Sequence, residues 1–471
     1  MNPLPLSRIA QWTNGRLEGV AEGADVLIDA ICTDTRGFDA TDGRAALYVA
    51  IVGERFDGND HVQAAADLGA RAALVSRPSA ARVPQLVVKD TVHALAAIAA
   101  GLQHGRATRV AAITGSNGKT GVKQMLLSIL SPLGATYANP GNRNNEIGLP
   151  LSVLEAPDDA QHAIYEMGAG KPGDIAWLTG VVRPDVALVN NVAPAHLERM
   201  HSLLGVAETK GAIYDALPAN GVAVINADDA FAQFFAGRSH GRRVIRFGLE
   251  ASADVTARDV RVGEQGSRFT LVTPQGEAVV ELPLVGRHNV ANALAAAAMA
   301  IGMADAAPQA IAAGLAAARP VQGRLVRHAL PSGALLIDDS YNANPGSLAA
   351  AIDTLAGIQG EGWLVLGEMG ELGTDAQALH AGVGHRARQA GIARLYAMGP
   401  LGRAAVEAFG EGAHNFDSHP ALIEALRGEL HPQARVLVKG SRSSAMERVV
   451  AALLEGAALP QDNTGSSTGA A

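Results

Sequence analysis

Cysteine, secretion signals and long apolar runs are scarce or missing in this 471-residue sequence. Its one cysteine, Cys32, excludes an intrachain disulfide and suits a reducing compartment. Residues 1–11 lack the basic and long apolar segments of a signal peptide. The most apolar helix candidate, residues 293–304, is much shorter than the ~20 residues that cross a bilayer. We therefore expect a cytoplasmic protein without membrane insertion, in which this segment is a buried core helix.

An excess of positive charge is also missing. The chain has 38 Lys and Arg residues against 46 Asp and Glu, a formal charge of -8, which argues against a general nucleic-acid binder. Hydrophobic residues make up 48% of the chain, enough for sizeable cores, and the length predicts roughly three domains. We expect these domains at residues 1–106, 107–319 and 320–460. Residues 461–471, mostly Gly, Ser, Thr and Ala, are expected to be a disordered tail.

Apolar runs alternate with helical patterns from residue 109 onward, which predicts an α/β fold. Runs at 163–166, 186–189 and 222–225 are typical of buried strands in a parallel sheet. Residues 253–285 differ, because alternating runs broken by Gly266 and Gly276 indicate an antiparallel insert. A further α/β pattern has its expected strands at 335–337, 363–366, 395–398 and 436–438. The first domain mixes short apolar runs with helices expected at 62–68 and 92–102.

The most informative segment is the glycine-rich run of Gly115, Ser116, Asn117, Gly118, Lys119 and Thr120. It follows the apolar run 110–113 and precedes a helical pattern over 122–130, the layout in which backbone N–H groups surround a nucleotide's phosphates. In such a loop the lysine neutralises charge and the threonine hydroxyl reaches Mg²⁺. Two residues rather than four separate Gly115 from Gly118, so an ordinary turn into a helix is the competing interpretation.

Three ionisable residues of the central domain could extend this site. Glu166 ends one expected strand and His196 lies just past another, at the sheet edge where α/β proteins bind ligands. A carboxylate there suits Mg²⁺; a helix cap or surface charge is the alternative for Glu166, and a structural role for His196. The pattern around Lys210 indicates a solvated helix cation. A lysine in a dry, cation-rich site can instead lose its proton and add CO₂, which gives a carbamate ligand for Mg²⁺.

Other polar residues sit at expected helix starts and strand ends. Asn289 and Asn292 suit an adenine edge, with helix capping as the alternative. Ordinary turns could explain each polar group of the third domain. That explanation would have to apply to all of these groups at the same time. They are Arg324, Asp339, Tyr341, Lys439, Ser441 and Arg442.

Taken in order, these motifs resemble those of the Mur ligases, the ATP-dependent amide ligases that build the peptide of bacterial cell-wall precursors. The resemblance runs nearly end to end through TGSNGKT (114–120), NNEIGLPLS (144–152), EMG (166–168), NVAPAHLE (191–198), Lys210, GRHNVANALAA (286–296), GRL (323–325) and DDSYNANP (338–345). Four features are similar to the family members that add D-alanyl-D-alanine: TDTR (33–36) with FDGND (56–60), DDSYNANP, LGEMGELG (366–373) and VKGSRSSAMERVV (438–450). Two departures, Gly121-Val122 and Asn59 where histidine is common, leave the site residues unchanged.

The resemblance implies a small N-terminal substrate domain, a central parallel-sheet domain that binds ATP and Mg²⁺, and a Rossmann-like C-terminal domain that closes over the site with D-alanyl-D-alanine. It implies catalytic roles for Lys119, Glu166, His196 and Lys210, with Lys210 carbamylated. The implied metal ligands are Thr120, Glu166, His196 and Lys210. Asn289 and Asn292 would meet adenine, while Arg324, Asp339 and Tyr341 would complete the nucleotide site.

The resemblance also implies where the other substrates bind. The uridine nucleotide of UDP-N-acetylmuramoyl-tripeptide would meet Thr33, Asp34, Thr35 and Arg36. Its sugar-peptide would meet Asn142, Arg143, Asn144 and Asn145. Substrate contacts from the third domain would come from Lys439, Ser441 and Arg442. The implied reaction forms an acyl phosphate and then an amide, with release of ADP and phosphate.

Three other functions stay in view. A non-catalytic nucleotide-binding homologue is disfavoured because Lys119, Glu166, His196 and Lys210 are all intact. A folylpolyglutamate synthase and the ligase that adds the third residue are disfavoured by the DDSYNANP and LGEMGELG segments. We expect a monomer, although the sequence does not settle the oligomeric state. It also leaves open the domain angle, carbamylation of Lys210, and whether the tripeptide ends in diaminopimelate or lysine.

Overall fold

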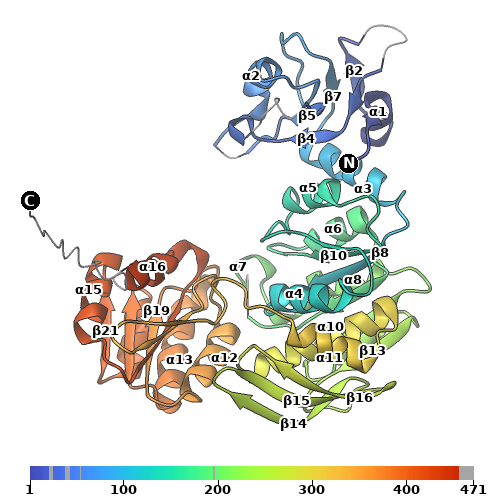
Figure 1. Ribbon diagram of the computed structural model, residues 1–471. Helices are drawn as coiled ribbons and strands as arrows, with labels where there is room; N and C mark the ends of the chain where they lie inside the picture. The colour runs from blue at the N-terminus through green and yellow to red at the C-terminus, as the bar shows by residue number, and fades with distance from the viewer. Residues whose placement is uncertain (21–24, 38–42, 54, 195–196, 456–471) are drawn as a thin grey trace, which may run out of the picture.

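The structure is a computed structural model that describes residues 1–20, 25–37, 43–53, 55–194 and 197–455. It has three α/β domains, each built around its own sheet (Figure 1). The predicted fold class is therefore confirmed, whereas the boundaries at 106/107 and 319/320 stay predictions. The expected tail, 461–471, lies outside the described residues. No helix among those residues is long and apolar enough to cross a membrane.

The N-terminal domain has a five-stranded sheet in the order β2-β7-β6-β5-β4. Strands β4 (Ala30–Cys32), β5 (Ala46–Val49), β6 (Ala72–Val75) and β7 (Gln85–Val87) are parallel, and β2 (Arg16–Glu18) is antiparallel. A separate antiparallel pair joins β1 (Leu4–Pro5) to β3 (Leu27–Ile28). The helices are α1 (Leu6–Thr13), α2 (Val62–Asp67) and α3 (Thr91–Gln103), with 3₁₀ turns η1 (Thr35–Gly37) and η3 (Gly58–His61). Helix α3 packs against α1 and also against α5 (Gly148–Glu155) and α6 (Asp174–Val182), so it joins the first two domains (Figure 1).

The central domain has a fully parallel sheet in the order β13-β12-β11-β8-β10-β9. Its strands are β8 (Arg109–Thr114), β9 (Thr136–Ala138), β10 (His162–Glu166), β11 (Val186–Val189), β12 (Val222–Asn226) and β13 (Arg243–Phe247). Successive side chains of a strand face opposite sides, so each strand contributes to two cores. In β8, Ala111 and Ile113 enter the core with α4 (Lys119–Leu130), α10 (Arg287–Ala304) and α11 (Pro308–Ala316). Val110 and Ala112 enter the core with α3, α5, α6 and α8 (Leu203–Asp215).

The remaining central elements include the predicted antiparallel insert. It is a three-stranded sheet of β14 (Thr256–Gly263), β15 (Gly266–Thr273) and β16 (Gly276–Leu282). Two shorter helices are α7 (Leu197–Met200) and α9 (Ala232–Arg238). The alanine-rich segment is a buried helix as expected, but α10 starts six residues earlier, at Arg287, and thereby includes Asn289 and Asn292.

The C-terminal domain has a six-stranded sheet in the order β17-β18-β22-β19-β20-β21. Its strands are β17 (Val326–Ala329), β18 (Leu335–Asp338), β19 (Glu361–Leu366), β20 (Arg394–Met398), β21 (Ala413–Phe416) and β22 (Ala434–Lys439). Only β17 is antiparallel among them. Helices α12 (Pro345–Ala356), α13 (Ala376–Gln389) and α14 (Gly402–Phe409) share one core, and α15 (His419–Glu429) and α16 (Glu447–Glu455) share the other. The 3₁₀ turns are η4 (Gly373–Asp375) and η5 (Arg442–Ser444).

Close packing of α11 on α4 gives a stability prediction. A Cβ added to Gly314 would lie 2.5 Å from the Cα of Ile129, a main-chain atom that cannot easily move. Gly314→Ala should lower the free energy of unfolding by about 1–3 kcal/mol. Gly180→Ala in α6 is the control, because nothing lies within 4 Å of its added Cβ, and it should gain up to about 1 kcal/mol. Urea unfolding measures both; equal stability of the two variants would contradict this packing.

Candidate functional site

The glycine-rich loop lies between β8 and the start of α4, at the carboxyl edge of the central sheet. Gly118 caps α4 with a left-handed φ of +78°, and an added Cβ would meet Asn292 Oδ1 at 2.4 Å and Asn190 Nδ2 at 2.5 Å. Glycine is therefore required by conformation and by space. Lys119 turns back over the loop, and its ammonium donates to the Gly115 carbonyl at 2.7 Å. A helix N-terminus with a lysine over it suits a phosphate group.

Several asparagine side chains form hydrogen bonds with this loop and with one another. Asn190 and Asn191 directly follow β11; Asn190 Nδ2 donates to the Asn117 carbonyl, and Asn191 Oδ1 accepts from the Asn117 amide at 2.8 Å. Asn190 Nδ2 also donates to Asn292 Oδ1 at 3.0 Å. We did not single out Asn190 or Asn191 from the sequence. Their position after a strand end, the signal used for Glu166, could have identified them.

Glu166 ends β10 and is almost fully buried, with 3% of its surface exposed. Its Oε2 accepts from the Thr120 hydroxyl at 2.9 Å and lies 3.2 Å from the Lys123 ammonium, while its Oε1 accepts from Asn144 at 3.0 Å. Burial alone would raise the pKa of Glu166, but Lys123, Lys119 and Arg324 together with the Thr120 hydroxyl hold it below its usual value. The carboxylate is thus charged and beside the loop. The helix-cap and surface-charge interpretations of Glu166 are wrong, and Lys123 was missed.

Lys210 is not the solvated cation that its helical pattern indicates. Only 1% of it is exposed in α8, and no carboxylate among the described residues lies within ion-pairing distance of its ammonium. Burial, with the positive charge of Lys119, lowers the pKa of Lys210 to about 7. Much of this amine is therefore neutral near physiological pH, the form that can add CO₂. His196 lies outside the described residues.

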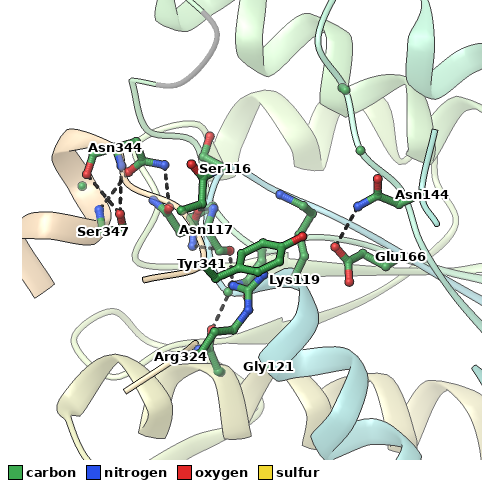
Figure 2. Close-up of a pocket in the computed structure, with 18 of the residues that line it drawn as sticks. Ser116, Asn117, Lys119, Gly121, Asn144, Glu166, Arg324, Tyr341, Asn344 and Ser347 are labelled. Carbon is green, nitrogen blue, oxygen red and sulfur yellow. Dashed lines mark hydrogen bonds between the residues drawn. The ribbon is translucent and has the colours of Figure 1, made fainter. Parts of the chain in front are cut away.

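The C-terminal domain reaches the loop directly (Figure 2). Arg324 Nη2 donates to the Thr120 hydroxyl at 2.9 Å, and its guanidinium lies 4.4 Å from the centre of the Tyr341 ring. The buried Arg324 Nε has no hydrogen-bond partner among the described residues, so a bound anion could accept from it. Asn344, which caps α12, donates to Asn117 Oδ1 at 2.7 Å. Two side chains of the third domain thus contact the glycine-rich loop.

A cavity of about 1110 Å³ joins the three domains at this point. Of the predicted residues it is lined by Ser116, Asn117, Gly118, Lys119, Asn144, Asn145, Glu166, Asn289, Asn292, Arg324, Asp339, Tyr341 and Lys439. The capping alternative for the α10 asparagines is wrong, because Gly286 is the N-cap; Asn289 instead donates to the Val285 carbonyl at 2.8 Å. Asp339 and Lys439 pair at 2.6 Å; burial raises the pKa of Asp339, and Lys439 opposes that rise.

Other predicted site residues lie away from the cavity wall. Ser441 is buried in a turn and donates its amide to the Glu368 carbonyl, while Arg442 lies 5.8 Å from the Tyr341 ring centre. Arg143 pairs with Glu155 at 2.6 Å, and the neighbouring Asn142 is exposed. The cluster of Thr33, Asp34, Thr35 and Arg36 belongs to the N-terminal domain, where a hydrogen bond from Arg36 lowers the pKa of Asp34 to about 2.

Family models match most of the chain. The Mur ligase middle domain matches residues 113–300, the Mur ligase glutamate ligase domain 323–442, and the Mur ligase family catalytic domain 28–103. The chain belongs to the Mur ligase family. The UDP-N-acetylmuramoyl-tripeptide--D-alanyl-D-alanine ligase of Escherichia coli (strain K12) is 46% identical, over 97% of this chain and 99% of that protein.

Solved Mur ligase structures have the same fold. A crystal structure of MurF from Acinetobacter baumannii superimposes with a TM-score of 0.90 at 33% identity and covers 97% of this chain and 99% of that one. MurF from Thermotoga maritima in complex with ADP gives 0.81 at 27% identity, over 90% and 97%. A folylpolyglutamate synthase from Mycobacterium tuberculosis, at 19% identity and 0.63, shares the fold alone. The resemblance to Mur ligases is thus confirmed for the family and the fold.

Of the predicted metal ligands, the two whose contacts can be compared directly are the oxygen groups of Thr120 and Glu166. No cluster of three or more His, Cys, Asp and Glu side chains that could hold a metal ion occurs in the described part of the chain. The Thr120 hydroxyl and the Glu166 carboxylate nevertheless lie side by side at the phosphate loop, and both are hard oxygen ligands of the kind Mg²⁺ prefers. These two oxygen groups fit part of the coordination shell of a Mg²⁺ ion.

Lys210 gives a pH-dependent stability prediction. Its pKa of about 7 in the folded protein lies below its ordinary value of 10.5, so the unfolded chain binds more protons between those pH values. The free energy of unfolding should rise with pH across that window, by at most about 1.4 kcal/mol per unit. Lys210→Met should remove this contribution and be more stable than the parent at pH 7. Urea unfolding in CO₂-free buffers measures both effects.

The control is Lys171→Met, because Lys171 is exposed and its replacement should leave the rise in place. CO₂ must be absent, since a carbamate would convert the buried amine into an anion. An unchanged pH slope in Lys210→Met would mean that this amine is not its source.

Proposed function

We propose that this Mur ligase joins D-alanyl-D-alanine to UDP-N-acetylmuramoyl-tripeptide and converts ATP to ADP and phosphate. The observation that carries the proposal is one cavity that collects a phosphate loop, a charged buried carboxylate and an arginine from another domain. The 46% identity to the Escherichia coli ligase over 97% of the chain supports this choice within the family. The intact Lys119, Glu166 and Lys210 disfavour a non-catalytic homologue.

ATP is proposed to bind along the carboxyl edge of the central sheet. Its phosphates would meet the loop amides, Lys119 and the unpaired Nε of Arg324. Asn289 and Asn292 would meet the adenine, and Asp339 and Tyr341 would complete the nucleotide site from the third domain. The ADP complex of the Thermotoga maritima enzyme supports nucleotide binding by this fold.

Mg²⁺ would be held by Thr120 and Glu166, with His196 and a carbamylated Lys210 as the remaining proposed ligands. When bound, the ion would neutralise phosphate charge and polarise the bonds to the transferred group. The near-neutral pKa of Lys210, about 7, supports carbamylation, because the amine must be neutral to react with CO₂.

The reaction needs a carboxylate to become electrophilic. The terminal carboxylate of the tripeptide attacks the γ-phosphorus, the bond to the bridging oxygen breaks, and ADP leaves an acyl phosphate behind. The amine of D-alanyl-D-alanine then attacks the acyl carbon, loses a proton and expels phosphate. Lys119 and Arg324 would stabilise the charge that gathers on the transferred group. Contact of Arg324 and Asn344 with the loop would help exclude water, which otherwise hydrolyses the acyl phosphate.

The remaining substrate contacts are proposals of the same kind. Thr33, Asp34, Thr35 and Arg36 would bind the uridine nucleotide, and Asn142, Arg143, Asn144 and Asn145 the sugar-peptide. Lys439, Ser441 and Arg442 would serve D-alanyl-D-alanine. We propose diaminopimelate as the third residue, because an Acinetobacter baumannii structure at 34% identity is described as a 2,6-diaminopimelate--D-alanyl-D-alanyl ligase. We further propose a cytoplasmic monomer that binds no nucleic acid and does not insert into membranes.

A product assay tests this function. ADP and phosphate should appear in equal amounts only when ATP, D-alanyl-D-alanine and UDP-N-acetylmuramoyl-tripeptide are all present. The diaminopimelate tripeptide should react faster than the lysine tripeptide. Appearance of AMP and pyrophosphate would refute the acyl-phosphate route, and absence of any product would refute the proposed reaction.

Lys119→Ala tests the phosphate loop. Loss of one electrostatic contact to the transferred group costs about 3 kcal/mol, so turnover should fall by two or more orders of magnitude. Lys89→Ala is the matched control, because Lys89 is exposed and does not line the cavity; its turnover should stay at the parent level. Near-normal turnover in Lys119→Ala would mean that the loop does not hold the reacting phosphate.

A further inference from the structure

Lys123 is a fully buried lysine that the reaction scheme leaves without a role. It lies in α4, four residues after Lys119, and none of its surface is exposed. Its ammonium donates to the main-chain carbonyls of Asn139 at 2.8 Å and Gly141 at 3.0 Å and lies 3.2 Å from Glu166 Oε2. A buried ammonium costs free energy unless its donors are paired, and this one has three partners. Two of the three are carbonyls of one short segment.

That segment, residues 139–145, follows β9 and has little regular structure of its own. The buried side chain of Asn139, within this segment, makes further hydrogen bonds that fix it. Asn139 Oδ1 accepts from the Glu166 amide at 2.8 Å, and its Nδ2 donates to the Arg143 carbonyl at 2.9 Å. The Gly168 amide donates to the Asn144 carbonyl at 2.8 Å. The segment is therefore fixed from α4 by Lys123 and from β10 by the main chain around Glu166.

The far end of this segment forms part of the cavity wall. Asn144 and Asn145 line the cavity, and Asn144 donates to Glu166 Oε1 at 3.0 Å (Figure 2). The same cavity is lined by His93 of the N-terminal domain and by Lys119 of the phosphate loop. A substrate anchored in the first domain must bring its carboxylate to the phosphate loop through this space. Asn144 and Asn145 are placed to contact it there.

We propose that Lys123 is a positioning residue for the UDP-linked substrate, which it serves by holding segment 139–145 through the Asn139 and Gly141 carbonyls. This inference rests on the proposed function, since that function supplies the substrate. Lys119 and Lys123 both belong to α4. The same helix therefore presents Lys119 to the nucleotide and fixes the part of the cavity wall that the UDP-linked substrate meets. The two carbonyl bonds do not require Glu166, and this separates the role from that of the ion pair.

The test compares Glu166→Gln with the double variant Lys123→Met/Glu166→Gln. Glu166→Gln removes the ion pair but keeps both carbonyl bonds, whereas the double variant removes both charges together and leaves no buried charge unpaired. Calorimetry gives the Kd for UDP-N-acetylmuramoyl-tripeptide and, separately, for ADP without Mg²⁺. In the double variant the Kd for the UDP-linked substrate should rise at least tenfold relative to Glu166→Gln. The Kd for ADP should stay within threefold, a split that a general loss of structure would not give.

Lys123→Gln in the Glu166→Gln background repeats the comparison with a polar side chain, in case the methionine variant does not fold. Substrate affinities within threefold of Glu166→Gln would overturn the inference, and so would an equal loss for substrate and ADP. Wild-type protein is the reference. If it binds ADP but not the UDP-linked substrate, the proposed function itself fails; if it binds both while the variants match, only the role of Lys123 fails.

Discussion

The buried carboxylate of Glu166 is the constraint on which the rest of the site depends. A charge with 3% exposure must be paired, and the pairing groups come from two different parts of the central domain. Thr120 and Lys123 reach it from α4, and Asn144 reaches it from the segment after β9. The Glu166 side chain at the end of β10 therefore contacts both α4 and the segment after β9.

The same carboxylate links the domains. The Thr120 hydroxyl donates a hydrogen bond to Glu166 and accepts one from Arg324, so a hydrogen-bonded chain runs from β10 through α4 to the third domain. Asn117 makes a second link, because it is held by Asn191 on one side and by Asn344 on the other. The loop and the third domain are thus joined by two hydrogen bonds, from Arg324 to Thr120 and from Asn344 to Asn117.

Much of this arrangement could be predicted from the sequence, because strand ends at one sheet edge meet by topology. The phosphate loop, Glu166 and the α10 asparagines follow from that rule together with the motifs. Helical lysines did not follow, since an amphipathic pattern reports the average face of a helix and not the burial of one side chain. A lysine in a helical pattern is expected at the surface, yet the side chains of Lys123 and Lys210 are both buried. The edge strands β9 and β21 were missed because polar residues such as Thr136, His414 and Asn415 interrupt their apolar pattern, whereas the equally short β11 is wholly apolar.

Most of the basic residues in this chain are arginines, and few are lysines. Only six of the 38 Lys and Arg residues are lysines, at positions 89, 119, 123, 171, 210 and 439. Lys119, Lys171 and Lys439 line the cavity, and Lys123 and Lys210 are buried near it. Arginine carries nearly all the remaining positive charge. An amine-directed covalent ligand would thus meet few competing primary amines. The selectivity of such a ligand for the cavity would come from the small number of lysines in the chain as well as from the shape of the cavity.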